Sequence, residues 1–424
     1  MLKQHICFVC LTALALAFPA LGAVASFHPI GFIGPPSQSI AYAVSADGST
    51  VVGESISPDG FQAFRWTVSG GIVGLGALPN PGGFLSSQAF GVSGDGAVIV
   101  GQSLTPDALL EDGSAMRWSQ ADGMTYLGNL GGTDTGGICQ GITPDASVIV
   151  GWCASSDGFY QPFRWTQAGG MQGLGVLPNE QIGRAQAVTA DGNTIVGNIS
   201  FGNTTSSTPF VWTAETGILP LASLSPGALG SGNAITPSGH VIVGQSAGRA
   251  VRWIDGVVYN LGEIQGGISS SSYWANAVSA DGNRIVGMAN FNAGQGTGEA
   301  FIWDPVHGMR SLKNTLLSDY GLRTIGWSLF DARGISADGR IIVGYGFDPQ
   351  GRQEGWMVDL GVANCVGDLN GDGLTDLTDL SALLSAYGTN SGDPGYLASA
   401  DLDHNGVIDL SDLAVMLGAY GCGA

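Results

Sequence analysis

Positively charged residues are scarce in this sequence. It has 14 Lys and Arg against 34 Asp and Glu in 424 residues, which gives a formal net charge of −20. Proteins that bind nucleic acids need clustered basic side chains to neutralise phosphates. The composition therefore excludes nucleic acid as the expected partner. Catalytic signatures are also missing, because no P-loop, no HExxH motif and no nucleophile elbow occurs.

Long hydrophobic runs are nearly absent. The one clear run, ICFVCLTALALAF, has 13 residues, follows Lys3 and precedes the small-residue sequence Ala23-Val24-Ala25. A run of that length is too short to cross a bilayer, and this arrangement is typical of a cleaved secretory signal peptide. We expect residues 1–25 to be that signal and the protein to be secreted, extracellular or at the cell surface, with no transmembrane segment.

Cysteine is also scarce. Of six cysteines, Cys7 and Cys10 lie in the predicted signal, so four remain in the exported chain. An even count in an oxidising compartment favours two disulfides, for which three connectivities are possible. The pattern favours one of them, because two cysteines flank a predicted hairpin turn and two flank the C-terminal region: Cys139 with Cys153, and Cys365 with Cys422. Free buried thiols are the alternative.

Glycine, by contrast, is abundant, with 70 residues, and a turn motif recurs seven times. The motif is Asp-Gly or a close variant, spaced by 48, 50, 46, 47, 43 and 57 residues at positions 47, 95, 145, 191, 238, 281 and 338. Self-similarity at such a period indicates a repeat architecture.

The first copy, residues 41–80, shows the unit. AYAVSA and STVVGE flank Asp47-Gly48 as a β-hairpin, and AFRWT and GIVGLGAL predict two further strands. Four short strands form a small antiparallel sheet that cannot bury both of its faces alone. The copies must therefore stack against one another.

The seventh copy ends early. It has two hairpin strands and EGWMVDL but no fourth strand, whereas HPIGFIGPP at 28–36 resembles the missing one. An N-terminal strand that completes the last sheet would close a ring and remove exposed sheet edges. The sequence predicts a mainly β fold: a seven-bladed β-propeller over 26–361, closed through 28–34.

The repeats resemble those of the HAF-repeat family of extracellular bacterial proteins. The resemblance rests on the A-F-x-W third strand, the V-S-x-D-G turn and the L-G-x-L fourth strand, over residues 28–360. It implies an extracellular propeller-like domain and no known reaction. The His of the family motif is replaced here, for example by Gln62 and Gln161.

Six tryptophans occupy one repeated slot and are expected to pack between blades, although sugar-stacking platforms are the alternative: Trp66, Trp118, Trp165, Trp212, Trp253 and Trp303. No catalytic residue is assigned. Variable segments such as 102–114 and 198–208 are the expected place for any ligand.

Composition changes at Val362, and two acidic loops follow, 33 residues apart. Both fit the calcium-loop pattern D-x-[DN]-x-[DN]-G, in which alternate residues point inward and a Gly makes the sharp turn. Two Ca²⁺ sites are predicted over 362–424. The expected ligands are Asp368, Asn370, Asp372, Leu374, Asp376 and Asp379 in loop one, and Asp401, Asp403, Asn405, Val407, Asp409 and Asp412 in loop two.

Residues 365–422 resemble a type I dockerin, a small α-helical domain of paired F-hand loops. No helix precedes either loop, and position 12 is Asp rather than the Glu of an EF-hand. The resemblance implies protein–protein interaction with a cohesin-like partner through positions 10 and 11. These positions are Leu377-Thr378 and Leu410-Ser411, and they depart from the common Ser-Thr pair.

These expectations combine into one hypothesis about function. The leading interpretation is an exported, non-catalytic propeller that is anchored or assembled through the calcium module. Two alternatives stay open. One is a glycosidase-type enzyme of polysaccharide catabolism, and the other is a carbohydrate-binding propeller.

Overall fold

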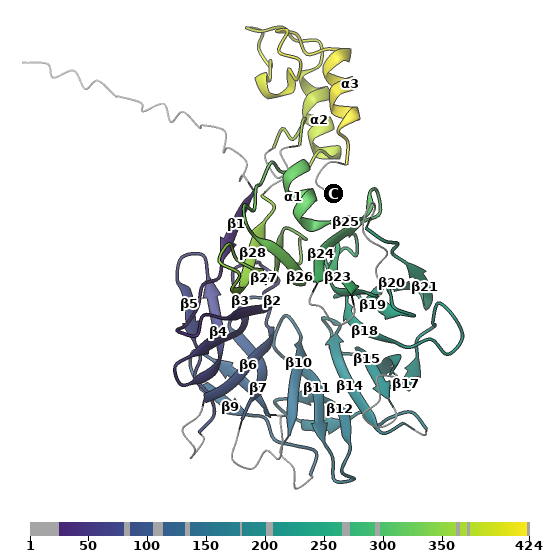
Figure 1. The fold of residues 1–424 in the computed structure, drawn as a ribbon. Helices are drawn as coiled ribbons and strands as arrows, with labels where there is room; N and C mark the ends of the chain where they lie inside the picture. The colour runs from purple at the N-terminus through teal and green to yellow at the C-terminus, as the bar shows by residue number, and fades with distance from the viewer. Residues whose placement is uncertain are drawn as a thin grey trace, which may run out of the picture. The chain divides into compact units, whose positions relative to one another are not determined.

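The computed structural model describes residues 25–79, 85–104, 113–131, 136–178, 180–200, 207–264, 272–292, 297–361, 365–370 and 374–421. Residues 25–360 form one compact unit, and residues 361–424 belong to a second. Over the described residues the first unit is almost entirely β, and the C-terminal region carries short helices (Figure 1). The predicted signal, residues 1–25, lies outside the described residues except for its last residue.

Each repeat forms four antiparallel strands, here called a blade. The innermost strand of each blade leads into the predicted Asp-Gly turn. These innermost strands are β2 (Ser39–Val44), β6 (Leu85–Val92), β10 (Gly137–Ile142), β14 (Ile182–Val188), β18 (Gly230–Ile235), β22 (Ser272–Val278) and β26 (Ser328–Ile335). The second strands are β3 (Val51–Ser57), β7 (Val98–Ser103), β11 (Val148–Ala154), β15 (Thr194–Ser200), β19 (Val241–Ser246), β23 (Ile285–Asn292) and β27 (Ile341–Phe347).

The third strands carry the A-F-x-W pattern or close variants of it, except the last, where Trp356 and Val358 replace the Phe and the Trp. They are β4 (Gly60–Thr67), β8 (Ser114–Ser119), β12 (Tyr160–Thr166), β16 (Ser207–Thr213), β20 (Arg249–Ile254), β24 (Thr297–Asp304) and β28 (Gln353–Asp359). The outer strands have four residues each and are β5 (Gly71–Gly74), β9 (Gly123–Tyr126), β13 (Gly170–Gly173), β17 (Gly217–Pro220), β21 (Val257–Asn260), β25 (Gly308–Ser311) and β1 (Ser26–Pro29). A short parallel pairing of β4 with β6 joins the first two blades into one sheet.

The hydrophobic core lies between neighbouring blades. One cluster, for example, joins Val98 and Val100 of the second blade to Phe163 and Trp165 of the third. All six repeated tryptophans belong to such clusters or pack against them. The expectation that they pack between blades is therefore confirmed. Burying large aromatic side chains at each blade interface supplies the stability that a single sheet lacks.

The N-terminal strand completes the last blade. β1 pairs antiparallel with β28, from Ser26 opposite Asp359 to Pro29 opposite Trp356. The Ile30 N–H then donates to the Gly355 carbonyl at 3.0 Å, as the Leu75 N–H donates to Ala63 at 2.8 Å in the first blade. The chain thus joins its first strand to its last sheet, as the sequence predicted, although the strand spans residues 26–29 and not 28–34.

The fourth strand of the sixth repeat is followed directly by a helix. In the segment MRSLKNTL, β25 ends at Ser311 and helix α1 (Leu312–Ser318) begins at the next residue. The Ser311 side chain caps this helix by accepting a hydrogen bond from the Asn314 N–H. Leu312 and Leu316 are buried on its inner face. The helix therefore buries both leucines on one face, because they are four residues apart.

The predicted Cys139–Cys153 disulfide is wrong. Both cysteines are buried thiols. A β-bulge between Cys139 and Gly141 shifts the register, so that Cys139 faces Gly151 and Cys153 faces Gly137. Two cysteines that are not opposite each other do not meet the close Cβ–Cβ approach of a disulfide. Burial in the apolar core raises the pKa of the Cys139 thiol.

The C-terminal region forms a small helical pair. It contains α2 (Leu377–Ala386), a single 3₁₀ turn (Ala398–Ala400) and α3 (Leu410–Gly418), around a core that includes Leu383 and Met416. The end of α2 meets the second loop, because the Gly388 N–H donates to the Ile408 carbonyl at 2.8 Å. Reciprocally, the Gly421 N–H donates to the Thr375 carbonyl at 2.9 Å. The two copies are therefore interlocked by equivalent bonds.

Two further predictions concern membrane-spanning segments and the second disulfide. Among the described residues no helix is both long and apolar enough to cross a membrane. Cys365 is buried, but Cys422 lies outside the described residues. The Cys365–Cys422 bridge therefore stays a prediction.

Candidate functional site

Every innermost strand of the propeller contains a β-bulge at the same repeat position. In the first blade, for example, the pairing passes from Ala41 opposite Gly53 to Ala43 opposite Val52 and skips Tyr42. A bulge leaves one residue outside the ladder and redirects its side chain. The skipped residues are Tyr42, Phe90, Gln140, Gln186, Asn233, Asn276 and Arg333.

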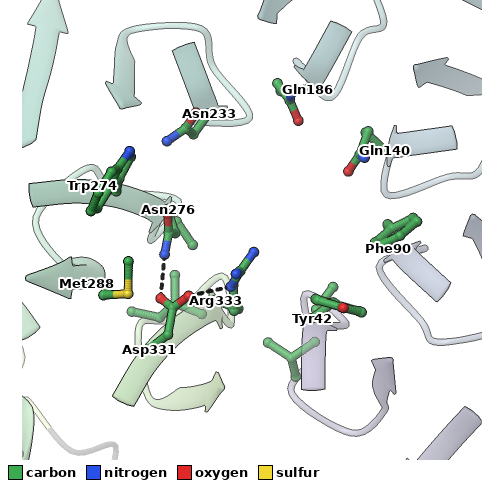
Figure 2. A pocket seen from close by; sticks show the side chains of 15 residues that line it. Tyr42, Phe90, Gln140, Gln186, Asn233, Trp274, Asn276, Met288, Asp331 and Arg333 are labelled. Atoms are coloured by element: carbon green, nitrogen blue, oxygen red, sulfur yellow. Dashed lines mark hydrogen bonds and ion pairs between the residues drawn. The ribbon is translucent and has the colours of Figure 1, made fainter. Parts of the chain in front are cut away.

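These seven bulge residues line one cavity of about 590 Å³. Figure 2 shows them around a common centre, each on a different strand. Trp274 and Met288 of the sixth blade also face this cavity. The volume is in the range of small-molecule sites. The ring of bulge residues therefore builds a binding-sized cavity at the axis of the propeller.

The position after each bulge residue must be small. It is Ala43, Gly91, Gly141, Ala187, Ala234, Ala277 or Gly334. A Cβ on Gly141 would lie 2.9 Å from the carbonyl oxygen of Gln186 on the next innermost strand. The innermost strands thus approach each other closely, which holds the bulge residues at fixed positions around the axis.

An apolar collar follows the ring of bulge residues along the axis. It has one β-branched side chain per blade, two residues after each bulge residue, and consists of Val44, Val92, Ile142, Val188, Ile235, Val278 and Ile335. Val44 and Ile335 also line the larger cavity. The cavity therefore has an apolar floor and a largely polar wall.

Arg333 is the one cationic residue lining the cavity among the described residues. Its Nε lies 2.5 Å from Oδ2 of Asp331, whose side chain is 1% exposed. Asn276 donates to the other oxygen of Asp331 at 2.8 Å (Figure 2). The Arg333 side chain itself stays 39% exposed because it faces the open cavity. The guanidinium is therefore anchored from behind and accessible from the cavity.

Electrostatics keep Arg333 charged. Burial alone would lower the pKa of Arg333, but the Asp331 carboxylate and the neighbouring Tyr345 and Tyr42 raise it. The guanidinium lies 5.7 Å from the ring centre of Tyr42 and 5.6 Å from that of Tyr345. Contacts with two aromatic faces add cation–π attraction and restrict its movement.

A second hydrogen-bond chain orients Tyr42. Its hydroxyl donates to Glu54 at 2.9 Å, and the Gln88 amide donates to the other carboxylate oxygen of Glu54. Burial, and then the charge of Glu54, raise the pKa of Tyr42. Tyr42 is therefore a neutral phenol whose ring packs beside Phe90, with ring centres 5.0 Å apart.

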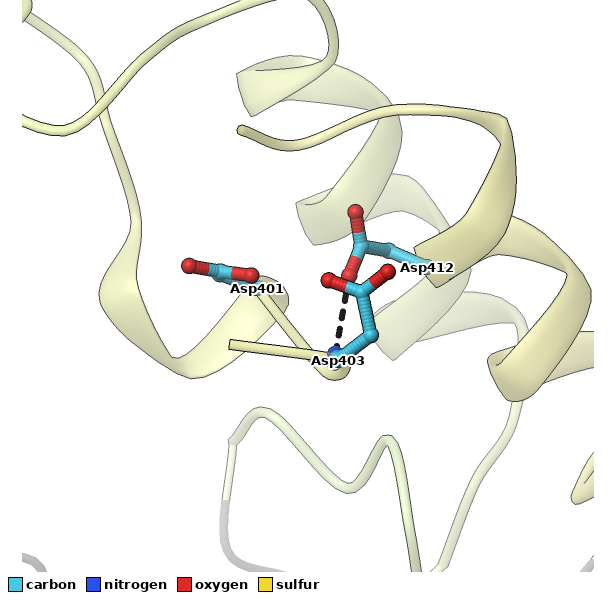
Figure 3. A group of neighbouring side chains, drawn as sticks. All are labelled: Asp401, Asp403 and Asp412. Atoms are coloured by element: carbon cyan, nitrogen blue, oxygen red, sulfur yellow. Dashed lines mark hydrogen bonds between the residues drawn. The ribbon is translucent and has the colours of Figure 1, made fainter. Parts of the chain in front are cut away.

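The C-terminal unit holds a different site in its second loop. Oxygens of Asp401, Asp403 and Asp412 lie within 4.8 Å of one another (Figure 3). Gly406 has φ 87° and makes the turn at position six that the pattern requires. Oδ1 of Asp412 accepts the N–H groups of Leu402 at 2.7 Å and Asp403 at 3.2 Å, whereas Oδ2 accepts that of Asp409 and keeps a second lone pair. This all-oxygen donor set fits a hard cation such as Ca²⁺.

The other predicted ligands of loop two, which are Asn405, Val407 and Asp409, make hydrogen bonds within the loop and at the start of α3. Asn405 donates to Asp403 and accepts from the Val407 N–H at 2.8 Å. Asp409 is the N-cap of α3 and accepts from the Ser411 N–H at 2.7 Å. The Tyr396 hydroxyl, which donates to Asp401 at 2.6 Å, holds the pKa of Asp401 below its ordinary value.

Loop one makes the same hydrogen bonds as loop two at its last two predicted ligands, Asp376 and Asp379. Asp379 accepts from the Leu369 N–H at 2.8 Å, as Asp412 does from Leu402, and Asp376 caps α2 as Asp409 caps α3. Asp368, Asn370 and Leu374 belong to the described residues, whereas Asp372 lies outside them. The structure therefore brings together one triad of predicted ligands, and the second site stays a prediction.

Two of the predicted partner-binding residues are prominent on the surface. Leu377 is 69% exposed and Leu410 is 68% exposed at the first turns of α2 and α3. The neighbouring Thr378 and Ser411 use their backbone N–H groups for capping. Further exposed apolar residues recur at the same 33-residue offset, namely Leu384 with Leu417 and Tyr387 with Tyr420.

The ring of bulge residues was not predicted from the sequence. Most of the two loop segments that were expected to bind ligand, 102–114 and 198–208, lies outside the described residues. A signal for the ring existed, because each bulge residue stands five positions before the Asp or Ser of the turn motif. That slot varies among aromatic, amide and basic side chains, and it is always followed by Ala or Gly and then by Val or Ile.

No family model matches the chain, and no curated protein matches it in sequence. Among solved structures, puromycin hydrolase is 13% identical, with a TM-score of 0.51, over 78% of this chain and 56% of the hydrolase chain. Virginiamycin B lyase from Staphylococcus aureus is 12% identical, with a TM-score of 0.46, over 79% and 99%. The β-propeller domain of the Trilobed protease from Pyrococcus furiosus is 12% identical, with a TM-score of 0.39, over 62% and 79%. At these identities the comparisons support a β-propeller fold and leave the activity open.

Proposed function

We propose that this protein is an exported, non-catalytic seven-bladed propeller that is anchored through a C-terminal docking module with two calcium sites. The observation that carries the proposal is the convergence of Asp401, Asp403 and Asp412 in a loop with the spacing of a calcium site. Loop one has the same helix cap and the same acceptor at position 12. We therefore extend the calcium proposal to both loops.

The exposed apolar pairs favour a docking role for this module. Leu377 and Leu410 together leave large apolar side chains at equivalent places of the two interlocked copies. Contiguous apolar groups exposed on a small domain are typical of protein-binding surfaces. The proposed partner is a cohesin-like protein on the cell surface or in an extracellular assembly.

A non-catalytic propeller is favoured over a glycosidase by the carboxylates of the axial cavity. Most glycoside hydrolases use two carboxyl groups that flank the scissile bond. Among the described residues that line the cavity, Asp331 is the one carboxylate, and it is held by Arg333 and Asn276. Such a carboxylate is poorly placed to act as general acid or base.

The test is calcium binding to the full exported chain by isothermal titration calorimetry. Replacing Asp401 and Asp412 with Asn should abolish the second site and reduce the stoichiometry from two ions to one. Asp393→Asn is the matched control, because Asp393 lies between the loops and accepts hydrogen bonds from Asn390. Unchanged stoichiometry in the double variant, or no calcium binding by the parent chain, contradicts the proposal.

Partner capture is tested separately from calcium binding. Leu377→Ala combined with Leu410→Ala should retain both ions and lose capture of the cohesin-like partner from the exported proteins of the source organism. Val306→Ala is the control, since Val306 is 82% exposed in the propeller. Capture that survives in a calcium chelator or in the double variant contradicts the docking role.

A further inference from the structure

We propose that the axial cavity binds a hydroxylated organic acid of sugar size, such as a uronic acid, with its carboxylate on Arg333. This inference is independent of the docking role, because every residue that carries it lies in the propeller. It rests on the chemistry of the ring of bulge residues, on the anchoring of Arg333 and on the volume of about 590 Å³.

The first argument is the charge inside the cavity. The Asp331 carboxylate lies behind Arg333, is almost fully buried, and accepts from both Arg333 and Asn276. Its two oxygens are thus occupied on the protein side, whereas the far end of the guanidinium points into the centre of the ring (Figure 2). The Nε of Arg333 pairs with Asp331 and one further N–H bonds Tyr345, and the remaining N–H groups of the planar guanidinium match a carboxylate in shape and charge.

The second argument is the wall opposite Arg333. By their order around the ring, Gln140 and Gln186 of the third and fourth blades lie across the cavity from the seventh blade (Figure 2). A primary amide carries two donors and an acceptor with two lone pairs, so two amides can bond several hydroxyl groups in different orientations. A ligand that reaches from Arg333 to this wall therefore needs hydroxyls distal to its carboxylate.

The third argument is the aromatic part of the lining. Trp274 and Phe90 face the cavity together with Tyr42, and the floor is the collar of Val and Ile side chains. Aromatic faces accommodate the apolar C–H face of a sugar ring, whereas a fully hydrated inorganic anion gains nothing from them. Carboxylate, hydroxyls and an apolar face together describe a sugar acid.

The decisive probes are pairs of sugars that differ only at the carboxylate. D-galacturonate and D-galactose form one pair, and D-glucuronate and D-glucose form a second. Calorimetric titration of the full exported chain in calcium should show binding of at least one acid, and at least about tenfold weaker binding of its neutral counterpart. No heat with either acid, or equal affinity within each pair, overturns the proposal.

The residues are tested on the acid that binds. Arg333→Gln should weaken its binding by roughly tenfold to a hundredfold, the usual loss for a charge-assisted hydrogen bond. Arg249→Gln is the matched control, because Arg249 also pairs with a carboxylate, Glu263, and lies 5.9 Å over an aromatic ring, but does not line the cavity. Equal losses in the two Arg variants, or none in Arg333→Gln, contradict the assignment.

A second variant covers the case in which Arg333→Gln fails to fold because Asp331 is left without its cation. Gln140→Leu keeps the side-chain size, lies across the ring and does not contact Asp331. It should weaken binding of the acid roughly threefold to tenfold, the loss expected for one or two neutral hydrogen bonds, with an unchanged melting temperature. Unaltered affinity in a folded Gln140→Leu protein overturns the proposed pose.

Discussion

At the scale of single residues, side-chain hydrogen bonds hold the turn motif, and the role of its Asp could be predicted from the sequence. In the second blade the Asp95 carboxylate accepts from the Ser93 hydroxyl at 2.7 Å and from the Ala97 N–H at 3.0 Å. The Ser93 oxygen in turn accepts from the Val98 N–H at 2.9 Å. The same buried hydroxyl precedes each turn, at Ser45, Ser93, Thr143, Thr189, Thr236, Ser279 and Ser336.

These contacts make part of the stability depend on pH. The hydrogen bond from Ser93, followed by that from Ala97, lowers the pKa of Asp95 in the folded state. A carboxyl with a lowered folded pKa stabilises the fold above its ordinary pKa, and the contribution disappears as the pH falls through the lowered value. The equivalent Asp47, Asp145, Asp191 and Asp281 also have lowered pKa values. We expect stability to fall below about pH 4.

Ser93→Ala tests whether the Ser93–Asp95 hydrogen bond stabilises the fold. At neutral pH the variant should lose roughly 1–3 kcal/mol of unfolding free energy, because a buried N–H loses its acceptor and Asp95 loses a donor. The penalty should shrink as the pH is lowered from 7 towards 3, since the parent loses its Asp95 contribution there. The measurement is urea unfolding across that range.

Thr236→Val is the control for this prediction, because blade five has Ser238 in place of the turn Asp. The two hydroxyl oxygens of Thr236 and Ser238 lie 3.2 Å apart, and neither group titrates. Its penalty should be the same at every pH. A Ser93→Ala penalty that is equally constant would show that Asp95 does not contribute.

The roles of the bulge residues, by contrast, could not be predicted from the sequence. The roles of Asp and Gly in the turn depend on neighbouring residues alone, so they can be inferred from a single repeat. The role of Arg333 or Gln140 depends instead on seven bulges converging on one axis, which no single repeat encodes. The disulfide error has two causes: the observed turn pairs Ile142 with Ile149, so a regular ladder would place Cys139 opposite Trp152, and the bulge then moves Cys139 opposite Gly151.

At the scale of elements, ring closure was predictable, although the closing strand spans residues 26–29 and the prediction named residues 28–34. The seventh repeat lacks an outer strand, and β1 supplies it by pairing with β28. Phe27 of β1 also packs edge-to-face on Trp327, with ring centres 5.0 Å apart. Helix α1 was missed, because a strand reading and a helix reading of SLKNTLL bury the same leucines, and the Ser311 cap decides between them.

Removing β1 should open the ring. A chain that starts at Ile30 should have a lower melting temperature than one that starts at Ser26, with a loss of roughly 2 kcal/mol or more from the exposed apolar surface. The free edge of β28 should also promote association between molecules. Thermal melting and size-exclusion chromatography measure the two effects. Equal melting temperatures and monomeric behaviour of both chains would contradict closure by β1.

At the scale of the whole molecule, the two compact units have separate cores. The core cluster around Leu383 and Met416 contains residues of the C-terminal unit alone. The clusters of the propeller, such as that around Trp253, contain none of them. Separate cores predict separate unfolding transitions. The sequence predicted this division from the change of composition at Val362.

Calcium should therefore act on one transition of the two. The C-terminal unit has a small core and eight loop aspartates, namely Asp368, Asp372, Asp376, Asp379, Asp401, Asp403, Asp409 and Asp412, whose mutual repulsion is relieved by bound cations. At an ion concentration a hundredfold above the dissociation constant, each site adds about 2.7 kcal/mol. In scanning calorimetry of a chain that spans residues 26–424, a chelator should shift or abolish the C-terminal transition and leave the propeller transition in place. Asp401→Asn should reproduce part of that shift in calcium, whereas Asp393→Asn should not. A chelator that moves both transitions equally, or neither, would contradict a calcium-dependent module beside an autonomous propeller.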